Sequence, residues 1–345
     1  MNSYAPEKIR NIVLVGHSGT GKTSLVEAVL FSAKVTNRLG SVDEGNTVSD
    51  YTEAETNRKT SISTSLLHCD WSGTKVNLLD APGYADFISD AKTAIWGADT
   101  AAILVNAQSG VEIGTDKAFG FADEFNRSNF FVINHMDKEF ADFDSALEGI
   151  QERFGHGAVP FHLPANSGDG FNQIVDVLQN KLFTYKTDGS GQAEVSDVPA
   201  ELQDQVDSLR EQIIDGAAES DDDLMEKYLE EGELSDEEIA QGLKIGIVNR
   251  TLFPVFCMSA SKNVGADLFM DFVVRQLPSP VEANLPTARK AGTDEEIELT
   301  TDSGGPLAAV VFKTISESVG DLSFLRVFSG AVKSGDDVHN TSRNA

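Results

Sequence analysis

The stretch Ile12-Val13-Leu14-Val15-Gly16-His17-Ser18-Gly19-Thr20-Gly21-Lys22-Thr23 decides the fold of this chain. An apolar run of strand length leads into a glycine-rich loop, and the helical pattern of residues 24–30 follows at once. This order is typical of phosphate-binding loops, in which glycines let successive backbone N–H groups converge on a phosphate. The helix N-terminus adds a positive dipole. A chance glycine-rich turn is the alternative, but the correct flanks on both sides favour a nucleotide site.

Two side chains of this loop have predicted chemical roles. Lys22 supplies a mobile cation to the β- and γ-phosphate oxygens, which makes it a candidate catalytic residue. The Thr23 hydroxyl completes the ligand shell of Mg²⁺. We therefore predict that all residues from Gly16 to Thr23 contact a nucleotide.

The composition describes an ordinary globular chain. Its 345 residues are 40% hydrophobic and 8% aromatic, which predicts a full core and two or three domains. No apolar stretch approaches the length that crosses a bilayer and the polar start has no secretory core, so we predict a cytoplasmic protein without a membrane partner. Cys69 and Cys257 are expected to be reduced and to act as small hydrophobic side chains.

The net charge of −28 argues against binding to DNA or RNA through a general basic field, so any RNA contact must be local. Acidic residues concentrate at 215–244, where only Lys227 and Lys244 are basic. This segment is either a solvated helical face or a docking surface for a basic protein.

Further apolar runs of strand length predict buried parallel strands at residues 76–79, 101–105, 130–133 and 254–258. Helical patterns lie between them, for example at 114–125 and 141–154. The fold class is therefore α/β, with a mainly parallel sheet and helices on both faces. Ligands of such sheets bind beyond the carboxyl ends of the strands, where the motifs described below stand.

Residues 160–249 interrupt this alternation and predict an inserted subdomain. An apolar segment at 171–185 precedes a Gly/Ser/Asp-rich linker at 187–197, and acidic helical sequence follows at 199–246. A helix at 268–277 then ends at Pro278-Ser279-Pro280.

The domain boundaries follow from these composition changes. We predict a nucleotide-binding domain at 1–285, with its insertion at about 160–250, and a linker at 286–305. Short β-like runs from 306 to 345 predict the start of a β-barrel that the chain is too short to close, so we expect the N-terminal part of a longer protein.

Asp80-Ala81-Pro82-Gly83-Tyr84 follows the run at 76–79. An aspartate here can hold Mg²⁺ through a water molecule, and the Gly83 N–H can bond the γ-phosphate. A plain turn is the alternative, since Pro-Gly is common turn chemistry. The position after a phosphate loop favours the functional interpretation.

Asn134-His135-Met136-Asp137 follows the run at 130–133 and predicts guanine recognition. A carboxylate accepts hydrogen bonds from guanine N1–H and the 2-amino group, neither of which adenine offers. Ser259-Ala260 after the last run fits the second base loop, in which a backbone N–H meets guanine O6. The motif therefore favours GTP and GDP over ATP, although Asn and Asp also simply end strands.

The polar residues 50–63 precede the run at 76–79. A mobile hydroxyl-bearing loop here can close on Mg²⁺, with Ser61 as a ligand, and open after hydrolysis. An exposed loop without this function is equally compatible with the sequence.

Together these motifs resemble translational GTPases, specifically elongation factor G and its paralogues. The similarity spans almost the whole chain, including Ala141-Asp142-Phe143, Met225-Glu226-Lys227-Tyr228-Leu229-Glu230, Leu277-Pro278-Ser279-Pro280 and Arg326-Val327-Phe328-Ser329-Gly330. The resemblance implies a P-loop GTPase domain, GTP/GDP and Mg²⁺ as ligands, a monomer, and binding to the ribosome through rRNA and the basic stalk protein, which the acidic insertion would face.

The departures from the family pattern concern catalysis. Tyr84 stands where the family usually has the histidine that positions the attacking water, and Ser18 and Thr60 cannot form the apolar gate around it. His135 replaces the lysine of the guanine signature, although an imidazole can still pack on a base. These changes resemble divergent elongation-factor-G-like paralogues.

Three hypotheses follow. The first is a GTPase of translation whose hydrolysis is slow without the ribosome, with Lys22 and Tyr84 as catalytic residues and Thr23, Ser61 and Asp80 around Mg²⁺. The second is a GTP-dependent ribosome-binding switch with vestigial hydrolysis. The third, a P-loop kinase or ATPase, is disfavoured by Asp137.

Overall fold

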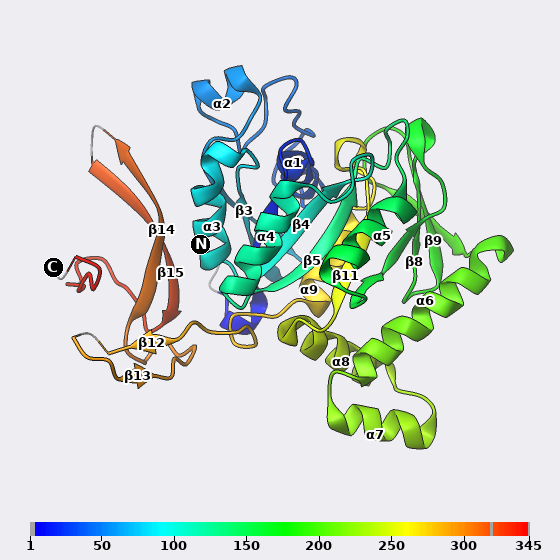
Figure 1. Cartoon of the computed structure of the whole chain (residues 1–345). Helices are drawn as coiled ribbons and strands as arrows, with labels where there is room; N and C mark the ends of the chain where they lie inside the picture. The colour runs from blue at the N-terminus through cyan, green and yellow to red at the C-terminus, as the bar shows by residue number, and fades with distance from the viewer. Residues whose placement is uncertain (1–3, 291, 318–319, 344–345) are drawn as a thin grey trace.

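A seven-stranded sheet forms the centre of the computed structural model, which describes residues 4–290, 292–317 and 320–343 (Figure 1). The strand order is β2-β3-β1-β4-β5-β11-β6. Neighbouring strands are parallel except β2, which pairs antiparallel with β3 at one edge. The strands are β1 (Ile9–Gly16), β2 (Ser65–Trp71), β3 (Thr74–Asp80), β4 (Thr100–Asn106), β5 (Ser128–Asn134), β6 (Ala158–Pro160) and β11 (Phe253–Cys257).

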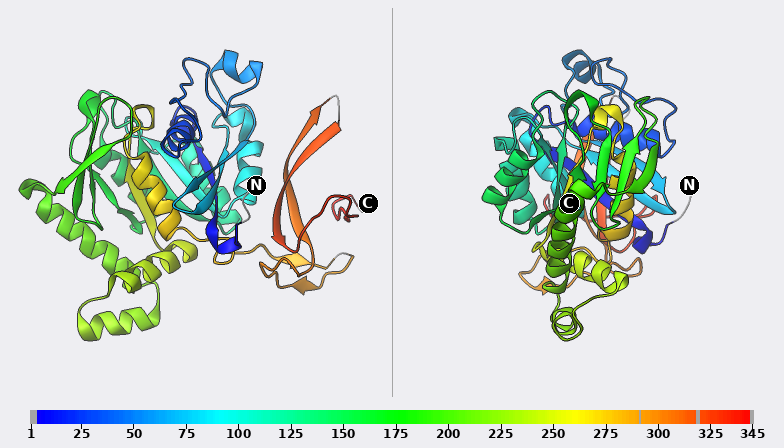
Figure 2. Two further views of the ribbon diagram at one scale, coloured as in Figure 1. Left: turned by 180° about the vertical axis from the view of Figure 1, so that it is seen from behind. Right: turned by 90° about the vertical axis from the view of Figure 1, so that its right-hand side faces the viewer.

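Helices cover both faces of this sheet. One face carries α3 (Ile88–Gly97), α4 (Ile113–Glu124) and α5 (Phe143–Phe154), and the other carries α1 (Lys22–Ser32) and α9 (Ala266–Gln276) (Figures 1 and 2). Every residue of β5 and β11 is buried, because parallel strands between two helical layers have no solvent-facing side. The predicted α/β class and its four further apolar strands are confirmed. Cys69 and Cys257 are buried free thiols, as expected.

The insertion leaves the sheet between β6 and β11. An antiparallel sheet of order β10-β9-β8-β7 is followed by acidic helices at the predicted place. Its elements are β7 (His162–Pro164), β8 (Gln173–Asp176), β9 (Lys181–Tyr185), β10 (Ala193–Asp197), α6 (Ala200–Ala218), α7 (Asp222–Glu231) and α8 (Asp236–Asn249). The linker predicted at 187–197 is wrong in part, because its second half pairs with β9 as the edge strand β10. Backbone pairing with a neighbour outweighs low strand propensity there.

The C-terminal segment is built from two antiparallel pairs. β12 (Ala288–Arg289) and β13 (Glu296–Ile297) form a short pair inside the linker predicted at 286–305, so that segment is not structureless. β14 (Ala308–Glu317) and β15 (Gly320–Ser329) form the longer pair. That they begin a β-barrel stays a prediction. Residues 1–3, 291, 318–319 and 344–345 of the predicted domains lie outside the described residues.

Polar contacts attach this pair to the part of the chain that contains the central sheet. Arg326 donates to Oδ1 of Asp99 at 2.6 Å, and Oδ2 of Asp99 accepts from Nδ2 of Asn11 at 2.8 Å. Nζ of Lys313 donates to the Thr64 carbonyl and lies 3.1 Å from Oγ of Ser63. Within the described part of the chain, no helix combines the length and hydropathy that a membrane crossing requires.

Candidate nucleotide-binding site

The predicted phosphate loop connects β1 to α1. Gly16 ends β1, and Gly21 is the N-cap of α1 with a φ of 85°, in the left-handed region. A Cβ atom at Gly21 would lie 2.2 Å from Nδ2 of Asn134, so both backbone conformation and space require glycine. Nδ2 of Asn134 in turn donates to the Thr20 carbonyl at 2.8 Å. The structure therefore brings the phosphate loop and the predicted base motif into contact.

Lys22 is the first residue of α1 and its side chain folds back over the loop. Its Nζ donates to the carbonyls of His17 at 2.7 Å and Gly16 at 3.2 Å. Burial lowers the pKa of this ammonium group, and the nearby Asp80 carboxylate partly offsets the effect. The ammonium group is thus held within the loop, where the predicted β- and γ-phosphate contacts would lie.

Three predicted metal ligands meet at the start of α1. Oγ1 of Thr23 lies 3.1 Å from Oγ of Ser61, although the two residues are far apart in sequence. Asp80 is buried, and neither of its carboxylate oxygens has a hydrogen-bond partner in the described chain. Burial raises the pKa of Asp80.

These groups fit a divalent cation. Hydroxyl and carboxylate oxygens are the ligands that Mg²⁺ accepts, and a buried carboxylate without partners is stabilised by a nearby positive charge. Among the described residues, no group of three or more His, Cys, Asp and Glu side chains forms a separate metal site.

The polar segment 50–63 is not the irregular loop that the sequence predicts. It contains the helix α2 (Glu53–Arg58), which begins with a capping box between Thr52 and Glu55. The buried Glu55 carboxylate accepts from the backbone N–H groups of Ile62 at 3.0 Å and Ser63 at 3.3 Å. Glu55 therefore positions the stretch that carries Ser61, a role that sequence reasoning missed.

The Asp80 motif follows β3 and lies against the phosphate loop. Ala81 and Pro82 are buried behind it. A Cβ atom at Gly83 would lie 2.8 Å from the backbone carbonyl oxygen of His17 in the phosphate loop, so only glycine allows this close approach. Tyr84 follows at the N-cap of η2 (Ala85–Phe87) and is 48% exposed.

The base motif and the second base loop form one network at the ends of β5 and β11. Oδ1 of Asn134 accepts from the Ala260 N–H at 3.0 Å. Oδ1 of Asp137 accepts from Oγ of Ser259 at 2.7 Å, and both residues are buried. The Met136 side chain points into the core and only its backbone joins the loops, with its N–H donating to the Met258 carbonyl at 3.2 Å.

His135 follows Asn134 in the base motif, and its backbone has a positive φ of 68°. Its Nε2 lies 3.0 Å from the Gly19 carbonyl, which can only accept, so Nε2 carries the hydrogen. Nδ1 is buried and has no partner among the described residues. Burial lowers the pKa of this imidazole, which is therefore held in its neutral form.

A pocket of about 320 Å³ lies at the phosphate loop, and His135 is the residue of the two base loops that lines it. Of the predicted site residues, the lining includes Ser18, Gly19, Gly21, Lys22, Thr23, Ser61, Gly83, Tyr84 and His135. Asp50 and Lys59, from the segment 50–63 that was predicted to close on Mg²⁺, also line it, and so do Val42 and Asp43, which were not predicted. The only feature of the sequence that could have indicated Val42 and Asp43 is their place in a polar segment between the phosphate loop and the next strand. His17 lies outside the lining, with Nε2 3.6 Å from Oε1 of Glu112.

The sequence matches the family model of the elongation factor Tu GTP binding domain over residues 7–279. The chain belongs to this family. The match covers the central sheet, the insertion and α9, and it identifies this part of the chain as a GTP-binding domain of the elongation factor Tu type.

The structure is also similar to a crystal structure of a protein from Thermus thermophilus. The TM-score is 0.84, the sequences are 31% identical, and the match covers 96% of this chain and 47% of the other. This chain therefore spans about half the length of that protein. The similarity extends beyond the family match and includes most of the C-terminal segment.

Proposed function

We propose that this protein binds GTP and hydrolyses it to GDP and phosphate as an elongation-factor-G-like factor of translation. The observation that carries the proposal is the network in which Asn134 and Asp137 bond the phosphate loop and the second base loop. One side chain touches both the phosphate end and the base end, so the two halves form a single nucleotide site.

Guanine selectivity would come from Asp137. Its carboxylate is buried, already accepts one hydrogen bond from Ser259, and has Nζ of Lys138 3.5 Å from its Oδ2. Guanine presents two donors, N1–H and the 2-amino group, to such a carboxylate, whereas adenine presents a lone pair. The Ala260 N–H, which by the family pattern meets guanine O6, donates to Oδ1 of Asn134 in this structure and would turn to the base when guanine binds.

Hydrolysis would use the phosphate end. Lys22 stabilises the charge that develops on the γ-phosphate as water attacks in line, and the backbone N–H groups of the loop orient the phosphates. Thr23 and Ser61 would hold Mg²⁺ directly and Asp80 through water. When bound, Mg²⁺ supplies positive charge that neutralises the phosphate oxygens.

Tyr84 limits the expected rate. A phenol with a pKa near ~10 is a poor general base at neutral pH, although it can orient water by a hydrogen bond. We therefore expect slow turnover by the free protein and stimulation by the ribosome.

The ribosome as partner rests on the resemblance to elongation factor G. The acidic helices α7 and α8 offer charge complementarity to the basic stalk protein, and rRNA contacts would be local because the chain carries a net charge of −28. We propose a monomer that acts in the cytoplasm.

A second candidate is a GTP-dependent ribosome-binding switch with vestigial hydrolysis. The side chain of Tyr84 is 48% exposed and makes no hydrogen bond within the described part of the chain, so no contact there orients its hydroxyl toward a phosphate. This observation favours a residue that takes no part in hydrolysis.

Single-turnover GTP hydrolysis with and without ribosomes separates the two candidates. The GTPase proposal expects stimulation by ribosomes and a lower stimulated rate in Tyr84→Phe, with Tyr4→Phe, a tyrosine outside the pocket whose hydroxyl bonds Asp70, as the control. Stimulated turnover that survives Tyr84→Phe removes the phenol from the mechanism. Nucleotide-dependent ribosome binding without any turnover favours the switch.

A further inference from the structure

A second cavity, of about 530 Å³, lies between the central sheet and the insertion. Its lining comes from α9 and β11 of the nucleotide-binding part and from β8, α6 and α8 of the insertion. Small-molecule sites in proteins commonly have this size and commonly lie where two parts of a chain meet. None of its lining residues lines the nucleotide pocket.

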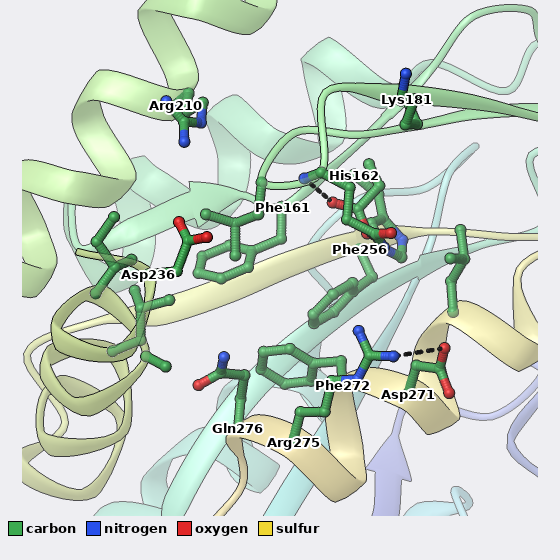
Figure 3. A pocket seen from close by; sticks show the side chains of 17 residues that line it. Phe161, His162, Lys181, Arg210, Asp236, Phe256, Asp271, Phe272, Arg275 and Gln276 are labelled. Atoms are coloured by element: carbon green, nitrogen blue, oxygen red, sulfur yellow. Dashed lines mark hydrogen bonds and ion pairs between the residues drawn. The ribbon is translucent and has the colours of Figure 1, made fainter. Parts of the chain in front are cut away.

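Three phenyl rings form the inner wall of this cavity (Figure 3). The ring centroids of Phe256 and Phe272 are 4.6 Å apart, and those of Phe161 lie 6.0 Å from Phe256 and 5.8 Å from Phe272. All three side chains are at least nine-tenths buried. Such a wall favours a flat aromatic ligand, because offset and edge-to-face ring contacts add to the burial of apolar area.

Two buried polar atoms of the lining lack partners among the described residues. His162 is 3% exposed, its ring packs edge-on to Phe256 at 4.7 Å, and its Nδ1 makes no hydrogen bond with any described residue. Oε1 of Gln276 is also buried and makes no hydrogen bond with any described residue. Buried polar atoms are nearly always hydrogen-bonded, so these two are unsatisfied groups in the cavity wall that a polar partner would stabilise.

Most charged side chains of the lining already have a partner. Asp176 accepts from Gln179 at 2.6 Å, Asp271 accepts from Trp71 at 2.8 Å and pairs with Arg275, and Lys181 pairs with Asp197 at 2.6 Å. Two charged side chains of the lining have no hydrogen bond or ion pair in the described part of the chain, those of Arg210 on α6 and Asp236 on α8.

Arg210 stands above the phenyl rings in Figure 3, and Asp236 lies to one side. A guanidinium group binds a carboxylate through two parallel hydrogen bonds. Asp236 disfavours a doubly charged anion, so a single negative charge fits this balance better than a phosphate.

We propose that this cavity binds a small aromatic monocarboxylate, with its ring against Phe161, Phe256 and Phe272 and its carboxylate on Arg210. Because the lining joins the insertion to the central sheet, an occupant would hold the two parts together. The proposal is independent of GTP binding, since the two pockets share no residue.

Isothermal titration calorimetry of the full chain with 2-naphthoate tests the proposal, and the uncharged 2-naphthamide is the ligand control. We expect one saturable site with a Kd on the order of 100 µM and binding of the amide at least about tenfold weaker. Arg210→Gln should weaken 2-naphthoate by about tenfold, and Ala240→Trp, which fills the cavity from α8, should abolish binding.

Arg153→Gln is the matched charge control, because Arg153 is an exposed arginine on α5 outside the cavity, and it should leave the affinity unchanged. Thermal melting by circular dichroism establishes that each variant is folded. Absence of saturable binding to the wild-type chain overturns the proposal. So does binding that survives both Arg210→Gln and Ala240→Trp in folded proteins, and so does displacement of the probe by GDP.

Discussion

The phosphate end and the base end of the proposed nucleotide site are built differently. At the base end, the polar groups of Asn134, Asp137, Ser259 and Ala260 already bond one another. At the phosphate end, both oxygens of Asp80 are buried without partners in the described chain, and the Tyr84 side chain is 48% exposed. The base end is therefore preorganised, whereas the phosphate end contains groups whose natural partners are a cation and phosphates.

This difference explains how amino-acid substitutions can be concentrated at the phosphate end of the site. A closed network penalises every substitution that leaves a buried partner unsatisfied, so the base end tolerates little change. Tyr84 belongs to no such network among the described residues and can change without cost to the fold. Recognition of the base and speed of hydrolysis are thus separable properties of this site.

The largest expected effect is at the phosphate end. Lys22→Ala removes a buried ammonium group and should weaken GDP and GTP by about 2–5 kcal/mol, or roughly 30-fold and upward. Calorimetric titration measures it, with Lys117→Ala on the exposed face of α4 as the control. Unchanged GDP affinity in folded Lys22→Ala would mean that the loop does not bind phosphate.

Asp137→Asn tests the base end. The amide presents a donor to guanine N1–H, so guanine nucleotides should bind about 1–3 kcal/mol more weakly, while the weak binding of ATP should not fall further. Asp144→Asn, the same change at an exposed site at the start of α5, should have no effect. Equal losses for GTP and ATP would show that Asp137 does not read the base.

His135 is the exception within the base end, because its Nδ1 is buried without a partner in the described chain. Its pKa is lowered by burial from the ordinary 6.5, so the unfolded chain binds this proton more readily. The free energy of unfolding should therefore fall as pH drops below 6.5, and His135→Asn should remove part of this slope. Urea unfolding between about pH 5 and 8 measures it, and a slope equally reduced by the exposed control His156→Asn would contradict the assignment.

The smallest expected effect is that of Tyr84→Phe on nucleotide binding. An exposed hydroxyl without a partner in the described residues contributes little, so GDP affinity should stay within about twofold and stability within about 0.5 kcal/mol. A large loss of GDP affinity would place the phenol on the nucleotide and weaken the contrast between the two ends.

Much of the nucleotide site could be predicted because its parts are local. The phosphate loop, the Asp80 motif and the base motif each follow an apolar strand, and parallel strands place their carboxyl ends at one edge. The helix α2 carried a readable signal as well, since Thr52 and Glu55 have the spacing of a capping box. No sequence signal indicated that Glu55 holds Ser63, because this contact depends on burial in the folded chain.

The insertion marks the limit of sequence reasoning. Its helices could be predicted from their acidic pattern, whereas β10 forms only because β9 offers a free edge. The cavity at its junction draws Arg210, Phe256 and Phe272 from three separate segments, so no local pattern indicates it.

One guanine nucleotide is proposed to bind between the phosphate loop and the base network. Isothermal titration calorimetry of the purified chain in Mg²⁺ with GDP, GTP and ATP measures this binding. We expect one site for GDP and for GTP, and at least about tenfold weaker binding of ATP. The absence of heat with both guanine nucleotides, or equal affinity for ATP, would contradict it.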